Sequence, residues 1–297
     1  MRSMLFLFGL IGVSIFSCQE NSGELVGAEI KFQDPVAVTI QGYNGNVMEP
    51  FLSRDGSELF FNNLNAPTEN TNLHGCVKIN DTLFQYNGEL QNVNTESLEG
   101  VPTMDRNRVL YYVYTGAYEQ TLSTIYRGQY SSGSILNPEL VENISLQTVG
   151  WVNFDVEVSS DGNTLYFVDG RFDENGGPYE ADLVMAKKEG GQFFRANNSE
   201  KIFQNINTGD LEYAAAISKN ELEICFTRVP APLNAGSEPK IFIASRSNKN
   251  EPFSHVQRIE QITGFAEGPT YTEDDKGLYY HKKVNGVFRL FLIEKEQ

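Results

Sequence analysis

Residues 159–167 are Ser159-Ser160-Asp161-Gly162-Asn163-Thr164-Leu165-Tyr166-Phe167, a tight turn followed by an apolar strand. Gly accepts the positive φ that such a turn requires and Asp tolerates it, so the stretch predicts a β-hairpin. Four related stretches, each with a turn and an apolar strand, occur elsewhere in the chain. They begin at Ser53, Thr103, Ser218 and Thr272. This repetition predicts the fold.

The repeat is long. Its turn residues at positions 55, 105, 161, 220 and 274 are separated by 50, 56, 59 and 54 residues. A unit of that length is too long for one hairpin and fits four short strands, which make one blade of a β-propeller. The sequence therefore predicts an all-β, five-bladed β-propeller. A six-bladed propeller is the alternative, if one copy has diverged beyond recognition.

Each unit predicts the same order of strands: an inner strand before the turn, an apolar strand after it, then a third and a fourth strand. The predicted third strands are residues 75–79, 123–130, 182–187, 240–245 and 287–294. Residues 200–204 are expected to form a fourth strand.

The last blade needs a strand from the other end of the chain, because the fifth unit stops after its third strand. Residues 30–40 precede the first inner strand and resemble residues 252–259, which precede the last one. We expect the N-terminal strand to complete the last blade, with Val36 near Leu290. Such closure removes exposed sheet edges. The propeller domain is expected to span residues 29–297.

The first residues predict export. A basic start, an apolar run over residues 4–16 and a small residue at Ser17 are typical of a signal peptide over residues 1–17. The ending Ile15-Phe16-Ser17-Cys18 resembles a bacterial lipobox, which implies a lipid on Cys18; an ordinary signal peptide cut elsewhere is the alternative. Residues 18–28 are polar and suit a flexible tether. The resemblance implies a lipid anchor in the bacterial membrane, expected to be the outer membrane, in either leaflet.

Charge and cysteine content exclude several classes. The chain has 39 acidic and 23 basic residues and a net charge of −16, which disfavours nucleic acid as a partner. Cys76 and Cys225 fall in the first and fourth units, which are not neighbours in a ring of five, so we expect free buried thiols. With three His and no Cys/His cluster, no metal site and no cofactor is predicted.

A family resemblance supports the propeller. The segment Asn205-Ile206-Asn207-Thr208-Gly209-Asp210-Leu211-Glu212, followed by Ala216-Ile217-Ser218, resembles the WD40-like PD40 repeats of TolB-like propellers, as do residues 94–103 and 267–280. The resemblance covers residues 29–297 and implies a binding module of the cell envelope. A fold alone implies no activity. The Asp-Gly pair is lost at Arg106, Asn220 and Glu221, which departs from the family pattern.

One acidic residue per unit stands near the start of each inner strand. These residues are Glu49, Glu99, Asp155, Glu212 and Glu267. In a propeller they would surround the central channel on one face, where they could raise one another's pKa or share a Ca²⁺ ion. Alternatively, each performs the same structural task in its blade.

Residues that are not repeated predict a ligand site at the same mouth. The candidates are Trp151, Asp155, Arg171, Glu212, Arg228, Glu267 and His281. An aromatic ring among acids and bases suits a sugar or a peptide. The alternative is that Trp151 fills the core and the charges are solvated.

Two functions follow as expectations. The first is a lipid-anchored module that binds an envelope protein, peptide or glycan without catalysis. The second is a glycoside hydrolase of the five-bladed arabinanase-like type, with Asp155 and Glu212 as the catalytic pair and Glu49 in the first-blade position. The resemblance to these hydrolases implies Asp at that first-blade position, and Glu49 departs from it.

Overall fold

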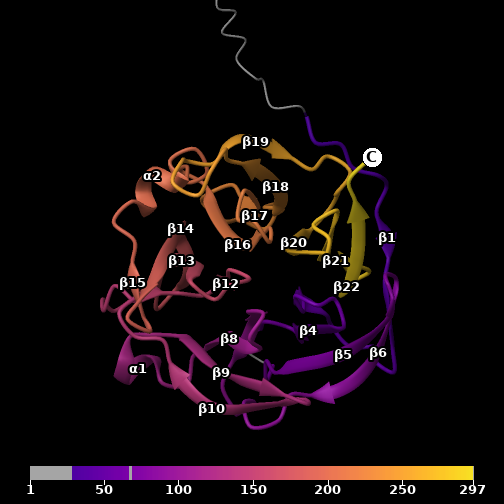
Figure 1. The fold of residues 1–297 in the computed structure, drawn as a ribbon, viewed down its shortest axis with the longest axis horizontal. Helices are drawn as coiled ribbons and strands as arrows, with labels where there is room; N and C mark the ends of the chain where they lie inside the picture. Colours follow the sequence, from indigo (N-terminus) through magenta and orange to yellow (C-terminus); the bar gives the residue numbers. More distant parts are fainter. Residues whose placement is uncertain (1–28, 67–68, 297) are drawn as a thin grey trace, which may run out of the picture.

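The chain forms a ring of five β-sheets in a computed structural model that describes residues 29–66 and 69–296 (Figure 1). Each sheet is one blade, and its first strand faces the centre of the ring. The five-bladed, all-β propeller predicted from the repeat is confirmed. The signal peptide, the tether and the lipid on Cys18 concern residues outside the described ranges. Among the described residues, no helix combines the length and the apolar character needed to cross a membrane.

The blades follow one another around the ring in chain order. Blade 1 contains β3 (Met48–Leu52), β4 (Glu58–Asn62), β5 (Leu73–Asn80) and β6 (Leu83–Glu89). Blade 2 contains β7 (Glu99–Met104), β8 (Val109–Tyr114), β9 (Ile125–Ser131) and β10 (Ser134–Leu140). Blade 3 contains β11 (Trp151–Val152), β12 (Val156–Val158), β13 (Thr164–Asp173), β14 (Gly176–Glu189) and β15 (Gln192–Arg195). Blade 4 contains β16 (Leu211–Ile217), β17 (Glu223–Val229), β18 (Lys240–Ser245) and β19 (Ser254–Arg258). Blade 5 contains β20 (Ala266–Tyr271), β21 (Gly277–Val284) and β22 (Val287–Glu294). Two short helices, α1 (Tyr118–Thr121) and α2 (Ser199–Phe203), lie in loops.

The N-terminal segment closes the ring, as predicted. Strand β1 (Val36–Ala37) pairs antiparallel with β22, with Val36 opposite Leu292. The N–H of Val38 donates to the carbonyl of Leu290 at 2.9 Å. Directly afterwards, β2 (Thr39–Gln41) pairs in parallel with β6 of blade 1. One short segment therefore completes blade 5 and joins it to blade 1, a second role that the repeat pattern did not predict.

The third strands agree with the prediction, and β18 and β22 have the predicted bounds. The expected strand at residues 200–204 is wrong, because these residues lie mainly in α2 and β15 is the outer strand of blade 3. The reason is the pattern of apolar residues. Ile202 and Phe203 are adjacent and both fully buried, whereas an outer strand with one covered face buries alternate residues.

The repeated turn is held by one small hydrogen-bond network. In blade 1, the Ser53 hydroxyl donates to Asp55 at 2.6 Å, and the same carboxylate oxygen accepts the N–H of Ser57 at 3.0 Å. Asn220 accepts equivalent bonds from Ser218 and Leu222, both at 2.9 Å, because its amide oxygen serves as well as a carboxylate. The loss of Asp in blade 4 therefore leaves the turn intact.

The turn of blade 2 is one residue shorter than the others. Asp105 pairs its N–H with the carbonyl of Val109, four residues on, whereas Ser53 pairs with Glu58, five residues on. The sequence alignment of Asp105 with Asp55 is therefore wrong, and Asp105 stands where the other blades have Ser or Thr.

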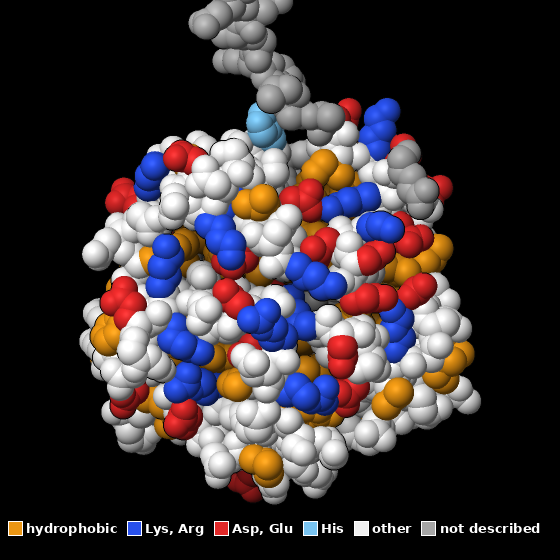
Figure 2. Space-filling model, in the orientation of Figure 1, with side chains coloured by type: hydrophobic (Ala, Val, Ile, Leu, Met, Phe, Trp, Pro, Cys, Tyr) orange, Lys and Arg blue, Asp and Glu red, His pale blue; other side chains and the backbone are white. Residues whose placement is uncertain are grey.

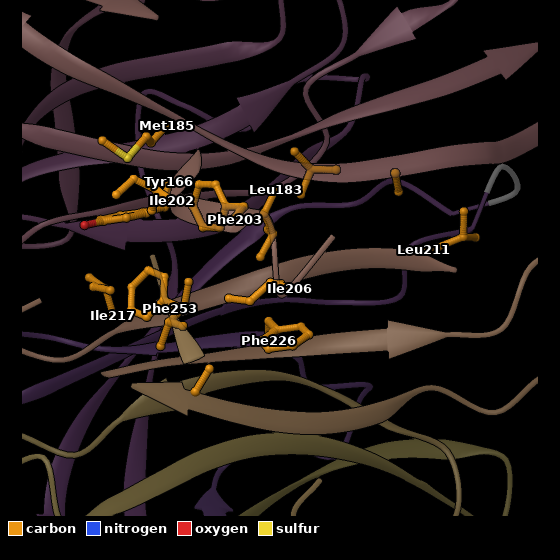
Figure 3. Packing of buried hydrophobic residues seen from close by; sticks show 14 of the residues in the cluster. Tyr166, Leu183, Met185, Ile202, Phe203, Ile206, Leu211, Ile217, Phe226 and Phe253 are labelled. Carbon is orange, nitrogen blue, oxygen red and sulfur yellow. The ribbon is translucent and has the colours of Figure 1, made fainter. Parts of the chain in front are cut away.

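Packing between blades forms the core. Figure 3 shows the cluster between blades 3 and 4, where Phe203, Ile206 and Phe226 meet Tyr166 and Leu183. Cys76 and Cys225 are free and buried, as predicted, and burial raises the pKa of each thiol to about 12.

Charge is mixed over the surface. On the face in view in Figure 2, Lys and Arg side chains gather near the centre with Asp and Glu between them. The excess of 39 acidic over 23 basic residues therefore does not make this face uniformly negative.

Candidate functional site

A cavity of about 860 Å³ occupies the centre of the ring at the end where the inner strands begin. Its floor carries three carboxylates, those of Glu49, Asp155 and Glu267, from blades 1, 3 and 5. Its wall combines strand residues with residues of the loops between second and third strands, such as Leu64 and Leu233. Fifteen of its 24 lining residues are apolar, including Phe154, Phe172, Phe265 and Phe288. The cavity therefore has a mainly apolar wall and buried acids at its base.

Glu49 reaches the floor because its strand is bulged. The pairing of β3 with β4 shifts register between Met48 and Phe51, and Glu49 has a positive φ of 46°. Val101, Ala214 and Gly268 hold the same bulge position in blades 2, 4 and 5, with φ of 52°, 50° and 63°. A positive φ costs a non-Gly residue on the order of 1 kcal/mol, and a carboxylate placed there is a candidate for function.

Glu267 is held on two sides. The Tyr213 hydroxyl donates to its Oε2 at 2.6 Å, and Nε2 of His281 lies 3.2 Å from its Oε1. The backbone N–H of Glu49 donates to Nδ1 of His281 at 3.1 Å, so that nitrogen needs a lone pair and the proton belongs on Nε2, facing Glu267. Tyr213, His281 and the Glu49 backbone thus fix the orientation of one carboxylate.

The other two acids favour their neutral forms. Burial raises the pKa of Glu49 to about 8, and the charges of Asp155 and Glu267 add to the rise against an opposing effect of His281. Burial also raises the pKa of Asp155 well above its usual value, although the N–H of Ala214 at 3.3 Å opposes the rise. Burial raises the pKa of Tyr213 as well, so its hydroxyl remains a donor. The floor therefore combines two acids whose neutral forms are favoured, Glu49 and Asp155, with the carboxyl group of Glu267, which Tyr213 and His281 orient.

Opposing effects act on the pKa of His281. Burial alone would lower its pKa, but the charge of Glu49 and the hydrogen bond and charge of Glu267 raise it. The Glu49 N–H at Nδ1 opposes a second proton on the ring. The net result is a raised pKa, and a second proton on Nδ1 would require the Glu49 N–H to move away.

Glu99 and Glu212 do not join the floor. Each accepts the N–H and the hydroxyl of a Thr four residues earlier: Thr95 for Glu99 at 2.9 and 2.6 Å, and Thr208 for Glu212 at 3.1 and 2.7 Å. Glu212 also binds Arg228 at 2.6 Å. The five acids are therefore not equivalent, because two of them brace the loop before their own strand.

The remaining predicted site residues lie around the cavity rather than in its wall. Trp151 is half-buried on β11, opposite Arg171 of β13. Arg171 is largely exposed and pairs with Glu180 at 2.6 Å. Arg228 pairs with Glu212, while His281 is fully buried beneath the floor. The structure thus brings together Asp155, Glu267, His281 and Glu49, and leaves Trp151, Arg171, Glu212 and Arg228 outside the lining.

The narrow end of the channel is closed below the acids. Glu157 binds Arg54 of blade 1 at 2.8 Å, the Thr103 hydroxyl of blade 2 and the N–H of Ile217 of blade 4 at 3.5 Å. Arg54 also donates to the carbonyls of Met104 and Val158. This cluster links four blades at the centre of the ring, on the side of the acids nearer the turns.

Among the described residues, Glu49, Glu267 and His281 are close enough to share a metal ion, with ligand atoms within 4.8 Å of one another. Both ring nitrogens of His281 already face protein partners. Metal binding would have to displace one of those partners.

Sequence reasoning missed Tyr213, Glu157 and the aromatic wall. A signal was available in the distance from each acid to the Ser, Thr or Asp that starts the turn. That distance is four residues for Glu49 and Asp155 (to Ser53 and Ser159), five for Glu267, and six for Glu99 and Glu212. Counting back from the turn would have separated the acids into three positions.

The chain matches no protein-family model and no curated protein sequence. Solved propellers align with it over most of its length. A solved glycoside hydrolase has a TM-score of 0.61 at 11% identity, over 90% of this chain and 93% of that chain. A family 117 glycoside hydrolase from Zobellia galactanivorans has a TM-score of 0.57 at 9% identity, over 90% of each chain. An α-L-arabinanase from Cellvibrio cellulosa has a TM-score of 0.53 at 13% identity, over 83% of this chain and 91% of that chain.

TolB from Acinetobacter baumannii also aligns, with a low TM-score of 0.44 at 15% identity. No family model supports the PD40 resemblance, and the propeller fold is the part of it that the structure bears out. At these identities the likenesses show the fold, and this chain shares a five-bladed β-propeller with glycoside hydrolases.

Proposed function

We propose that this protein is a glycoside hydrolase whose active site is the floor of the central cavity. The observation that carries the proposal is the meeting of three buried carboxylates from blades 1, 3 and 5 at the base of an aromatic-walled funnel. The fold shared with solved glycoside hydrolases adds support. Glycoside hydrolysis uses a pair of carboxyl groups, one of which must stay protonated, and this floor places Glu49 with its raised pKa beside Glu267.

Glu49 is the proposed general acid. Its pKa of about 8 keeps it protonated at neutral pH, and its carboxyl group makes no hydrogen bond to a described residue. It is therefore free to protonate the leaving oxygen of a bound glycoside. Glu267 is the proposed nucleophile, because Tyr213 and His281 orient it. Glu267 takes the role that the sequence analysis assigned to Glu212, because Glu212 is paired with Arg228.

The spacing of these two acids favours a double displacement. A carboxylate oxygen of Glu49 and one of Glu267 lie within 4.8 Å. Inverting enzymes hold their two carboxyl groups about 6.5–9.5 Å apart to admit water, whereas retaining enzymes hold them about 5–5.5 Å apart. Glu267 would attack the anomeric carbon as Glu49 protonates the leaving group. Water, deprotonated by Glu49, would then release the sugar with its configuration retained.

The test is hydrolysis of a panel of aryl glycosides and polysaccharides by the purified protein, with the anomer of the first product read by NMR. We expect turnover with retention. Glu267→Gln should lower kcat on the order of 10³-fold or more, whereas Asp155→Asn should have a smaller effect because a protonated Asp resembles Asn. Glu99→Gln, a buried acid outside the floor, is the control. Binding without turnover would instead support a non-catalytic glycan-binding module.

We also propose, from the sequence alone, that the protein is exported and lipid-anchored through Cys18. Metabolic labelling with an azido fatty acid, compared between the wild type and Cys18→Ser, tests this. No label on the wild type would contradict it.

A further inference from the structure

We propose that the cavity selects glycosides whose bound sugar carries few free hydroxyl groups, such as 6-deoxy or O-methyl sugars. This inference rests on the proposed hydrolase function and specifies its substrate class. It follows from what the wall of the cavity offers, considered group by group.

The wall above the acids offers mainly carbon. Met48 and Phe154 precede Glu49 and Asp155 in the chain, Val101 holds the bulge position of Glu49 in blade 2, and the Tyr213 hydroxyl contacts Glu267. Phe172 of β13 and the loop residues Leu98, Leu233 and Phe265 add further apolar surface to the lining. Rings of this kind present flat apolar faces that match the C–H faces of a sugar.

The polar groups of the wall are largely engaged with the protein. The Tyr213 hydroxyl donates to Glu267, and Oδ1 of Asn65 accepts from Asn62 at 2.7 Å. The Thr115 hydroxyl accepts the N–H of Leu98 at 3.4 Å. On an exposed loop, the backbone N–H of Asn234 donates to the Ser237 hydroxyl at 3.0 Å, and Oδ1 of Asn234 accepts the N–H of Gly236 at 2.9 Å. Few donors or acceptors remain for hydroxyl groups of a sugar, apart from the catalytic acids themselves.

A hydroxyl group buried without a partner weakens binding, whereas a methyl group at the same position gains from contact with the wall. The charged residues of the lining also favour a neutral sugar. Lys283 is the one Lys or Arg that lines the described cavity, and it lies over the rings of Phe265 and Phe288 at 6.0 and 5.5 Å. A uronic acid would bring a further negative charge into a cavity whose described lining offers Lys283 alone to compensate it. A neutral, hydroxyl-poor sugar fits both conditions.

The experiment compares matched pairs of 4-nitrophenyl glycosides that differ only in a methyl or a hydroxymethyl group on C5: D-fucosides against D-galactosides and L-rhamnosides against L-mannosides, in both anomers. We expect kcat/KM to favour the deoxy member of the accepted pair by about 10-fold to 100-fold. Calorimetric binding of the corresponding methyl glycosides to Glu267→Gln provides a second measure with the same expected preference.

A substitution in the lining of the cavity provides a further test of the substrate class. Val152→Thr adds a hydroxyl group to a half-buried lining position at nearly constant volume and should narrow the preference by several-fold. Val149→Thr, at an 80% exposed residue outside the lining, should not.

The two proposals fail in different ways. Hydrolysis with equal or better kcat/KM for the hydroxylated members overturns the substrate class and leaves the hydrolase standing. Absence of both turnover and binding for every glycoside overturns both proposals.

Discussion

At the scale of single residues, position along an inner strand decides what an acid does. Glu49 occupies a bulge and faces the cavity, whereas Glu99 begins its strand two residues earlier relative to the turn and folds back onto Thr95. Both are Glu, both are buried and both lie on first strands of adjacent blades. The difference lies in whether local N–H and O–H donors reach the carboxylate. Glu99 has such donors and Glu49 has none among the described residues.

The raised pKa of Glu49 predicts a pH dependence of stability. A free Glu ionises near 4.5 and Glu49 near 8, so between these values the folded state holds more protons than the unfolded state. Stability should therefore fall as pH rises from 4.5 to 8. Glu49→Gln should flatten this slope, measured as the Tm at pH 5 and pH 8. Glu260→Gln, at an exposed residue, should leave it unchanged. An equal slope in wild type and Glu49→Gln would contradict the prediction.

At the scale of elements, the loop that enters a blade is braced by its own first strand. In blade 4, Glu212 holds Thr208 and Arg228, and Arg228 also donates to the carbonyl of Ile206 at 2.6 Å. In blade 2, Glu99 holds Thr95 in the same way without an Arg partner. These loops end beside the cavity wall, so the brace positions Leu98 and Leu211 without touching the floor.

Glu212→Ala should therefore cost stability rather than chemistry. It leaves Arg228 and two donors of Thr208 without their acceptor, which should lower the free energy of unfolding by about 2–4 kcal/mol. Glu99→Ala should cost less, about 1–2 kcal/mol, because no cation is left unpaired. Urea unfolding measures both. Loss of activity with an unchanged midpoint would show that Glu212 acts in the reaction.

At the scale of the whole molecule, two devices hold the ring. One is the N-terminal segment, which pairs with β22 and then with β6. The other is the cluster around Glu157 at the narrow end of the channel, where Arg54, Thr103 and the Ile217 backbone meet. The first closes the outer edge of the ring and the second ties four blades at its centre.

Val38→Pro tests the closure. Proline removes the N–H that donates to Leu290 at the point where the segment passes from blade 5 to blade 1. We expect a lower Tm and faster hydrogen exchange in β22 than in the strands of blade 3, measured by mass spectrometry. Val38→Ala keeps the N–H and should show a smaller effect. Equal exchange in the two variants would show that the pairing contributes little.

Arg54→Met tests the central cluster. It leaves the carboxylate of Glu157, which is 6% exposed, without its cation and should destabilise the protein by about 3–5 kcal/mol. Adding Glu157→Gln should recover part of that loss, because the buried charge is then removed. A double variant no more stable than Arg54→Met would contradict a charge-based role.

The sequence by itself determined the number of blades and the closure of the ring. Each turn is a local structure, set by a Ser, Thr or Asp and the residues next to it, and a local pattern repeated five times counts the blades. The segment at Val36 could be expected to lie beside the one at Leu290 because the last blade lacked a strand. Burial of Cys76 and Cys225 followed from their places in apolar strands.

Only the tertiary structure decided which acids share the floor. A one-residue shift or a bulge turns a strand side chain to the other face, and such shifts depend on pairing with the next strand rather than on the residues themselves. Glu267 is oriented by Tyr213 from a neighbouring blade and by His281 from the next strand, contacts that no local pattern specifies. The cavity exists where five blades meet, so its chemistry is a property of the ring.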